Sequence, residues 1–206
     1  STLMNILGFL DRTTQGTYYL NSEDVTVSSD TALAKLRNQN VGFVFQQFQL
    51  LPRLTAIANV ELPLVYAGVK KSERMARAEQ ALEDVGLGDR INHRPNQLSG
   101  GQKQRISIAR AVLLDPEILI LDDSLSAVDA KTEEMILLAL KMVRAGKTTI
   151  ITSHRLSAIQ HAELILVMDE GEVVQSGIHE ELVNQNGWYK EMYLHQQLES
   201  LVEQGG

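Results

Sequence analysis

The alternation of short, β-branched apolar runs with longer stretches of helical periodicity is the feature that most constrains this chain. Such runs, bounded by turn residues, are typical of strands in a parallel sheet that helices cover on both faces. The alternation therefore predicts an α/β fold with a mostly parallel sheet flanked by helices. The predicted strands are Val41–Phe45, Glu117–Leu121, Thr148–Thr152 and Leu164–Met168, with Glu172–Gln175 as an antiparallel edge strand after the turn at Asp169–Gly171.

Helical periodicity fills the intervals between these runs, and apolar residues recur there at spacings of three and four. From about Leu50 to Ser99 the sequence carries no strand pattern. We therefore expect a single domain of residues 1–206, in which residues 50–99 form an inserted helical subdomain and residues 100–206 complete the α/β core. The predicted helices are Lys71–Val85, Leu98–Leu114, Ala130–Val143 and Gly187–Val202, the last led by the packing residues Trp188, Tyr189 and Met192.

The most specific local pattern is Leu98-Ser99-Gly100-Gly101-Gln102, at the start of a predicted helix. One interpretation is a capping box, in which Ser99 caps the helix and the Gln102 side chain bonds back to it. The other is a phosphate site, because such a run leaves N–H groups exposed at the positive end of a helix dipole. The residues alone leave both interpretations open.

Two carboxylates end the most hydrophobic strand, which reads Ile118-Leu119-Ile120-Leu121-Asp122-Asp123. An acid in this place lies at the carboxyl edge of a parallel sheet, where α/β proteins bind their ligands. In P-loop NTPases such an aspartate helps to hold Mg²⁺. A solvated turn at the strand end is the alternative.

Together, Leu98–Gln102, the strand ending in Asp122, the run Ser126-Ala127-Val128-Asp129 and His154 after a further strand resemble the nucleotide-binding domain of ABC transporters. The order and spacing of these motifs agree with that family over most of the chain. The resemblance implies a P-loop NTPase-like fold and an ATP-binding subunit. It also implies that ATP binding and hydrolysis, in a head-to-tail dimer of two such domains, drive transport by a membrane partner.

The resemblance further implies a role for each matching residue. Three residues would be catalytic: Asp123 as general base, His154 on the γ-phosphate, and Gln46 as a sensor of metal and water. Mg²⁺ would be held by Ser1, Gln46 and, through water, Asp122. Residues Ser99–Gln102 would clamp the γ-phosphate of a nucleotide on the opposite subunit, and Asp129 would lie in a loop that crosses the dimer interface. The residues implied to contact ATP are Ser1, Thr2, Gln46, Ser99, Gly100, Gly101, Gln102, Asp129 and His154.

Position 123 departs from the family pattern. Hydrolysing members carry glutamate there, whereas this chain has Asp123, whose side chain is one methylene shorter. A carboxylate misplaced by about 1 Å can cost ~10²-fold in rate. Aspartate at this position resembles the degenerate site of heterodimeric ABC exporters. The sequence therefore predicts slow or absent hydrolysis at the site that this chain builds for itself.

The second departure concerns the phosphate loop, which should read G-x-x-x-x-G-K-[ST] before a helix. The first residues, Ser1-Thr2-Leu3-Met4-Asn5, resemble the segment just after that lysine, so the given sequence lacks the N-terminal strands and most of the Walker A loop. If the numbered chain is the whole molecule, at least three hydrogen bonds to charged oxygens are lost, at about 1.5–3 kcal/mol each. Very weak ATP binding at its own site would follow. Gly146-Lys147-Thr148 does not replace the loop, because Lys141 stands where a glycine is needed and a strand follows.

The two halves of the chain resemble different branches of the family. Residues 1–110 are similar to the ATPase subunits of lipoprotein-releasing and macrolide-export systems, and residues from about Asp115 onward to the ATPase domains of multidrug exporters. A chimera joined near Ala111–Leu114 is one hypothesis. The alternative to an active ATPase is a non-hydrolysing partner, or a fragment, that supplies Ser99–Gln102 to another subunit's site.

Charge and composition limit the kinds of partner that this chain can have. The formal net charge of −7 argues against nucleic acid as a partner, and the absence of cysteine excludes disulfides and thiolate metal sites. No apolar run approaches the ~20 residues that span a bilayer, and no signal peptide opens the chain. With the resemblance, the expected partners are a second ABC ATPase domain and a transmembrane transporter subunit or domain. The expected location is cytoplasmic, peripheral on the inner face of the plasma membrane through that membrane partner.

Overall fold

A computed structural model describes residues 2–126 and 128–204, and the chain divides into two compact units, Ser1–Thr152 and Ser153–Gly206. The strands and long helices expected from the sequence are present, each within two residues of its predicted ends. The first unit contains α1 (Thr2–Leu7), β1 (Tyr19–Leu20), β2 (Glu23–Asp24), α2 (Asp30–Asn40), β3 (Val41–Phe45), α3 (Ala56–Val60), α4 (Leu62–Tyr66), α5 (Lys71–Asp84), α6 (Gly100–Val112), β4 (Ile118–Asp122), α7 (Ala130–Val143), β5 (Thr148–Thr152) and 3-10 turns at Gly88–Arg90 and Pro95–Gln97. The second contains a 3-10 turn at Leu156–Ala158, β6 (Ile165–Asp169), β7 (Glu172–Gly177), α8 (His179–Leu182) and α9 (Trp188–Gln204).

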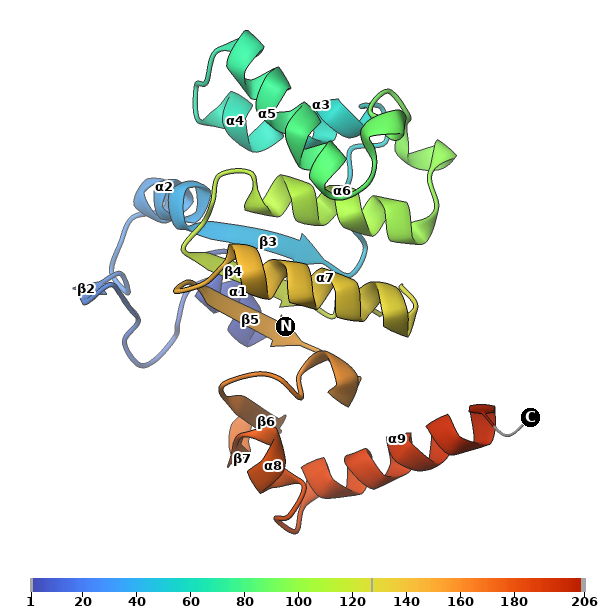
Figure 1. The fold of residues 1–206 in the computed structure, drawn as a ribbon. Helices are drawn as coiled ribbons and strands as arrows, with labels where there is room; N and C mark the ends of the chain where they lie inside the picture. The colour runs from blue at the N-terminus through green and yellow to red at the C-terminus, as the bar shows by residue number, and fades with distance from the viewer. Residues whose placement is uncertain (1, 127, 205–206) are drawn as a thin grey trace. The chain divides into compact units, whose positions relative to one another are not determined.

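A parallel sheet with the strand order β3-β4-β5 forms the centre of the first unit (Figure 1). Its middle strand, β4, is buried on both faces. Leu119 and Leu121 pack with residues of α6 and α7, whereas Ile118 and Ile120 pack with Met4 of α1. Because successive side chains of a strand point to opposite faces, this division shows helices on both sides of the sheet. The predicted α/β fold class is confirmed.

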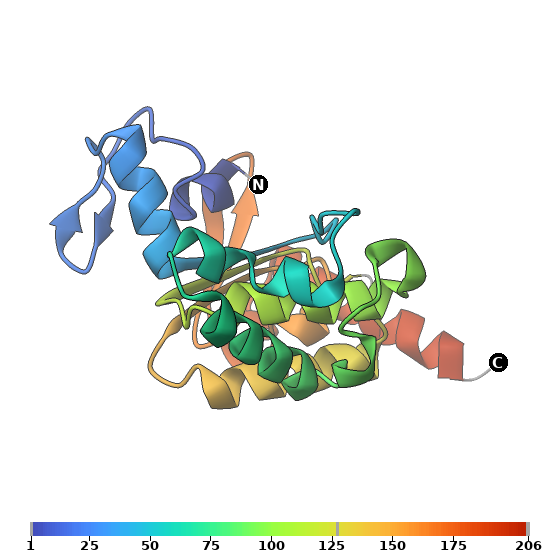
Figure 2. The same cartoon turned by 90° about the horizontal axis from the view of Figure 1, so that it is seen from above.

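Residues 50–99 form the predicted helical part and contain no strand in this fully described stretch. Helices α3, α4 and α5 lie over α6, as the view from above shows (Figure 2). Helix α6 has two packing faces, because Ile106 belongs to the core of the helical part and Ile108 to the core of the sheet. It therefore connects the helical part to the sheet.

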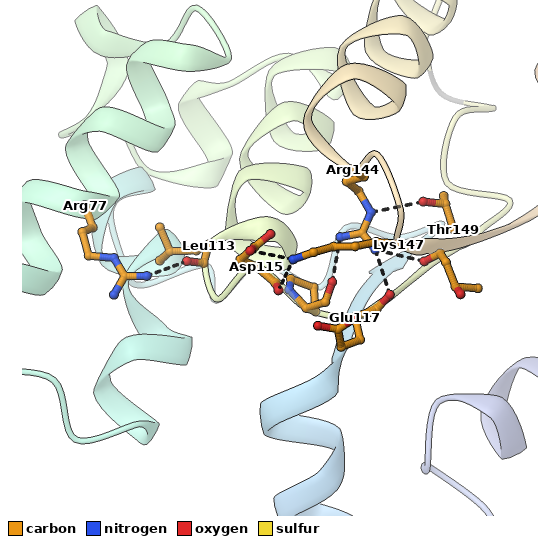
Figure 3. A network of polar contacts seen from close by, with 9 residues as sticks. Arg77, Leu113, Asp115, Glu117, Arg144, Lys147 and Thr149 are labelled. Atoms are coloured by element: carbon orange, nitrogen blue, oxygen red, sulfur yellow. Dashed lines mark hydrogen bonds and ion pairs between the residues drawn. The ribbon is translucent and has the colours of Figure 1, made fainter. Parts of the chain in front are cut away.

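Arg144 joins the ends of β4 and β5 that lie away from their shared carboxyl edge (Figure 3). Its side chain donates to Thr149 Oγ1 at 3.1 Å and to the carbonyl oxygens of Pro116 and Thr148, both at 2.9 Å. Burial lowers the pKa of Arg144, while the nearby carboxylates of Asp115 and Glu117 oppose that shift. The guanidinium thus supplies donors to carbonyl groups of the segment before β4 and of the start of β5.

Lys147, in the segment that superficially matches a phosphate loop, has a structural partner in the same network. Its Nζ atom lies 2.6 Å from Asp115 Oδ2 and 2.9 Å from the Asp115 carbonyl oxygen. The next residue, Thr148, begins β5 rather than a helix. The prediction that a strand, rather than a helix, follows Gly146-Lys147 is therefore confirmed.

Replacing Arg144 by methionine should lower the free energy of unfolding by about 2 kcal/mol, because several carbonyl oxygens lose their donor at once. Urea denaturation followed by circular dichroism measures this change. Arg12→Met is the matched control, since the ion pair of Arg12 with Asp30 is exposed, with side-chain exposures of 45% and 93%. Such a pair contributes about 0–1 kcal/mol. Equal midpoints for the two variants would contradict the structural role of Arg144.

The second unit packs a two-stranded antiparallel sheet, β6-β7, against α8 and α9. The antiparallel return of Glu172–Gly177 confirms the prediction for that segment. Tyr189 is fully buried in this core and Met192 packs against it, as expected, but Trp188 was wrongly predicted to pack, because its side chain is 45% exposed. In the described part of the chain, no helix combines the length and the apolar character that a membrane crossing requires.

Candidate functional site

The carboxyl ends of β3, β4 and β5 meet at one edge of the sheet and bring together three of the predicted site residues. The register pairs Phe45 with Asp122 and Asp122 with Thr152. Gln46 comes directly after β3, and its Nε2 atom donates to Asp123 Oδ2 at 3.0 Å. Gln46, Asp122 and Asp123 therefore lie within one hydrogen-bonded group at this edge.

Thr152 holds the Asp122 carboxylate and the backbone of Asp123. Its hydroxyl donates to Asp122 Oδ1 at 2.8 Å and accepts from the Asp123 backbone N–H at 2.9 Å. No local pattern in the sequence indicates a role for Thr152. The signal that could have found it is its position: it ends a strand parallel to the one that ends in Asp122, so both lie at the same edge.

Asp123 has a left-handed backbone, with φ of +43°. This conformation is unfavourable for residues with a Cβ atom, although aspartate tolerates it better than most. The Asp123 N–H also lies 3.1 Å from the Thr152 carbonyl oxygen, and Ser126 Oγ donates to the Asp123 carbonyl oxygen at 2.9 Å. These bonds hold the turn that places the Asp123 carboxylate beside Gln46.

The oxygen donors at this edge suit a magnesium ion, which prefers carboxylate, carbonyl and water ligands. No group of three or more histidine, aspartate or glutamate side chains among the described residues could hold a metal ion by itself. Mg²⁺ ordinarily keeps several waters and binds through one or two carboxylates together with substrate phosphates. Asp122 and Gln46 fit that second arrangement, in which the metal arrives with a nucleotide.

Ser99 and Gln102 form the capping box expected from one interpretation of the sequence. The Gln102 N–H donates to Ser99 Oγ at 3.3 Å, and the Ser99 N–H donates to Gln102 Oε1 at 2.9 Å. Ser99 and Gly100 are exposed, and the first N–H groups of a helix have no acceptor inside it. Capping therefore leaves the N–H groups of Gly100 and Gly101 available to an anion. Within the described residues, no hydrogen bond joins Ser99–Gln102 to the Asp122–Asp123 turn.

Asp129 caps the start of α7. Its carboxylate accepts from the Thr132 N–H at 3.0 Å and from Thr132 Oγ1 at 2.7 Å, and these bonds lower the pKa of Asp129. Thr2 is exposed at the start of α1. Ser1 and Ala127, which the sequence analysis also placed in functional motifs, lie outside the described residues.

His154 belongs to the second unit and is exposed there. Its carbonyl oxygen accepts from Gln196 Nε2 at 2.7 Å, and Gln196 Oε1 accepts from the Leu156 N–H at 3.0 Å. A side chain of α9 therefore fixes the backbone on either side of Arg155. The sequence analysis missed this contribution of Gln196, because nothing local indicates a bond between residues so far apart in the chain.

Comparison with known proteins gives consistent similarities. A family model described as ABC transporter matches residues 1–126. The chain is 49% identical over 175 residues to an uncharacterized ABC transporter ATP-binding protein, YknY of Bacillus subtilis, which covers 84% of this chain and 76% of that protein. It is 45% identical over 175 residues to the macrolide export ATP-binding/permease protein MacB of a Shewanella species, 84% of this chain but only 27% of MacB. Matches of this length extend across Ala111–Leu114, where a junction was hypothesised.

The fold has close counterparts among solved structures. A dimeric structure of the ATP-binding cassette MJ0796 in a post-hydrolysis state, bound to ADP and Pi, superimposes with a TM-score of 0.81 at 38% identity. The match covers 91% of this chain and 81% of that one. The proteins similar in sequence and those similar in fold are therefore both ATP-binding proteins of the ABC type.

Proposed function

Because the chain belongs to the ABC transporter family as an ATP-binding subunit, we propose that it works in a head-to-tail pair of ATPase domains that drives a membrane partner. ATP is the nucleotide of this family, and its members hydrolyse it. One observation supports the proposal above the others. Gln46, Asp122 and Asp123 converge at the sheet edge, whereas Ser99–Gln102 stand apart at an exposed helix start. The first group would serve the chain's own nucleotide and the second a nucleotide on the partner.

At its own site, the chain would combine a metal-organising residue with a base. Asp122 and Gln46, with Ser1, would hold Mg²⁺, which supplies charge neutralisation on the phosphate oxygens when it is bound. Thr2 would contact phosphate at the start of α1. Phosphoryl transfer to water depends mainly on positioning and electrostatics, so the hydrogen bonds from Gln46 and Thr152 contribute by fixing the carboxylates.

Asp123 would accept the proton of the attacking water. Its Oδ2 atom already accepts a hydrogen bond from Gln46, so the amide orients the base and leaves the other oxygen for water. For His154 we propose the role that the family resemblance implies, a contact with the γ-phosphate. Because Asp123 is one methylene shorter than glutamate, we propose that hydrolysis at this site is slow.

At the partner's site, the exposed start of α6 would donate hydrogen bonds to the bound nucleotide. An anion could be bound there by the Ser99 hydroxyl and the N–H groups of Gly100 and Gly101, at the positive end of a helix of 13 residues. Asp129 would lie at the interface between the two ATPase domains. A γ-phosphate held by the partner has the charge and the acceptor oxygens that this helix start requires.

The membrane partner would meet the region that follows Gln46, which includes residues 52–63 and contains α3. The relative MacB is described as a combined ATP-binding and permease protein, and this chain corresponds to 27% of it. We propose a cytoplasmic location, peripheral on the membrane through that partner, for a single ATPase domain of residues 1–206 with residues 50–99 as its helical subdomain.

One observation favours a second candidate function. Asp123, which replaces the glutamate of hydrolysing family members, belongs to the nucleotide site that the chain builds for itself. The Ser99–Gln102 capping box, which would serve the partner's nucleotide, is intact. A subunit of this kind could complete the active site of a partner without hydrolysing ATP itself. The two candidates share the transporter but differ in which subunit performs the chemistry.

Titration calorimetry of the full-length protein with ATP, with and without Mg²⁺, tests binding at the chain's own site. We expect a dissociation constant on the order of micromolar with Mg²⁺ where the phosphate loop is complete and very weak binding where it is missing, because that loop supplies several hydrogen bonds to charged oxygens. In Asp122→Asn the affinity for ATP should no longer depend on Mg²⁺, because the amide cannot replace the carboxylate charge. Failure to bind millimolar ATP by a protein that still melts cooperatively would contradict an own-site function and leave the second candidate.

A further inference from the structure

The loop after Gln46 contains two consecutive residues with left-handed backbone, Phe48 with φ of +59° and Gln49 with φ of +44°. Neither residue is a glycine, and a bulky side chain makes this conformation uncommon. Such a conformation persists only where the surrounding structure imposes it. A nearby element must therefore hold this pair of residues.

Two side chains of α6 hold it. Ser107 Oγ donates to the Phe48 carbonyl oxygen at 3.1 Å. The Arg110 guanidinium donates to the same oxygen at 3.0 Å and to the Gln49 carbonyl oxygen at 2.9 Å. Ser107 is fully buried and Arg110 half-buried, so water competes little for the two bonds to the Phe48 carbonyl oxygen, whereas the bond to Gln49 is exposed. The rigid fork of a guanidinium suits two neighbouring acceptors in a way that a lysine does not.

These contacts lie within three residues of Gln46. The Phe48 N–H donates to the Phe45 carbonyl oxygen at 3.0 Å, which closes the loop onto the end of β3. Gln46 lies inside this closed turn and donates to Asp123. Its side-chain position therefore depends on where the carbonyl groups of Phe48 and Gln49 are held.

We propose that Ser107 and Arg110 are positioning residues, which keep the Gln46 amide on Asp123 by fixing the carbonyl groups of Phe48 and Gln49 to α6. The consequence for the reaction rests on the proposed function of Gln46 at the nucleotide site. Helix α6 begins at Ser99–Gln102, so a movement of that helix start toward or away from a partner would reach Gln46 through Ser107 and Arg110.

Arg105 provides a matched comparison on the same helix. It also donates to a backbone carbonyl oxygen, that of Val85 at 2.9 Å, but this contact ties α6 to the end of α5 rather than to the loop. If Arg110 only stabilised the fold, Arg105→Gln and Arg110→Gln would behave alike. If Arg110 positions Gln46, only Arg110→Gln should disturb the Gln46 side chain.

The test is the side-chain amide resonance of Gln46 in the full-length protein labelled uniformly with ¹⁵N, assigned with Gln46→Glu. Asp123→Ala supplies the shift of the released amide. In Arg110→Gln we expect the resonance to move most of the way to that reference, and the backbone amides of Phe48 and Gln49 to exchange about tenfold faster. Arg105→Gln should leave both unchanged.

An unchanged Gln46 resonance in Arg110→Gln, or an equal change in Arg105→Gln, would overturn the inference. If Arg110→Gln does not fold, Ser107→Ala removes a single bond and must shift the resonance in the same direction, and no shift in that variant would also overturn it. The proposed function fails separately, through turnover. A Gln46→Ala variant that leaves the ATPase rate unchanged contradicts the role of Gln46 in the reaction but not its placement by Arg110.

Discussion

Replacing Ser99 by alanine should lower ATP turnover by the assembled transporter about 10²-fold or more, while it destabilises the chain by only about 1 kcal/mol. The small loss of stability follows from the capping box, because alanine removes the acceptor for the Gln102 N–H. The large loss of turnover follows from the proposed contact with a phosphate on the partner. A donor aimed at transition-state charge typically contributes far more to rate than a cap contributes to stability.

Ser29→Ala is the control that separates these two effects. Ser29 is also an exposed serine that caps a helix, and its hydroxyl accepts from the Ala32 N–H at 3.2 Å. Its loss should lower the melting temperature by a similar amount and leave turnover unchanged. Equal turnover in Ser99→Ala and Ser29→Ala would show that Ser99 acts only as a cap, and the proposed function in trans would be wrong.

The strands of the sheet could be predicted because each one carries its own apolar signal. Val41–Phe45 and Thr148–Thr152 match their predicted bounds in full, and the strand ending in Asp122 is shifted by a single residue. The middle strand, which ends in Asp122, is buried on both faces, and this explains why a continuous apolar run predicts it rather than an alternating one. The same local logic identified the capping box, since its two partners are only three residues apart.

The details of the site could not be predicted, because they depend on contacts between distant segments. Thr152 lies 30 residues after Asp122 in the chain, yet its hydroxyl donates to the Asp122 carboxylate and accepts from the Asp123 backbone N–H. The left-handed backbone of Asp123 and Phe48 is imposed by hydrogen bonds from such distant groups, and neither residue is one that signals a turn as glycine does. Trp188 was wrongly placed in a core for a related reason, since helical spacing cannot say which side of a helix finds a partner.

Replacing Asp123 by glutamate should raise the rate of hydrolysis at the chain's own site by about 10²-fold. The longer side chain would carry the carboxylate about 1 Å further toward the attacking water, where hydrolysing members of the family place it. The measurement is single-turnover ATP hydrolysis in the assembled pair with the partner's own site inactivated. An unaltered rate would contradict the interpretation of Asp123 as the cause of slow hydrolysis.

The same substitution should cost some stability, because glutamate tolerates the left-handed backbone at position 123 less well than aspartate. Asp115→Glu is the matched control, since Asp115 also has a left-handed backbone, with φ of +53°, and an exposed carboxylate far from the proposed chemistry. The free energy of unfolding should fall by about 1 kcal/mol in both variants. Only Asp123→Glu should hydrolyse ATP faster. A faster hydrolysis rate together with a lower free energy of unfolding in Asp123→Glu would support this interpretation. Aspartate would then give this chain a less strained turn at position 123 but a slower reaction than glutamate gives its hydrolysing relatives.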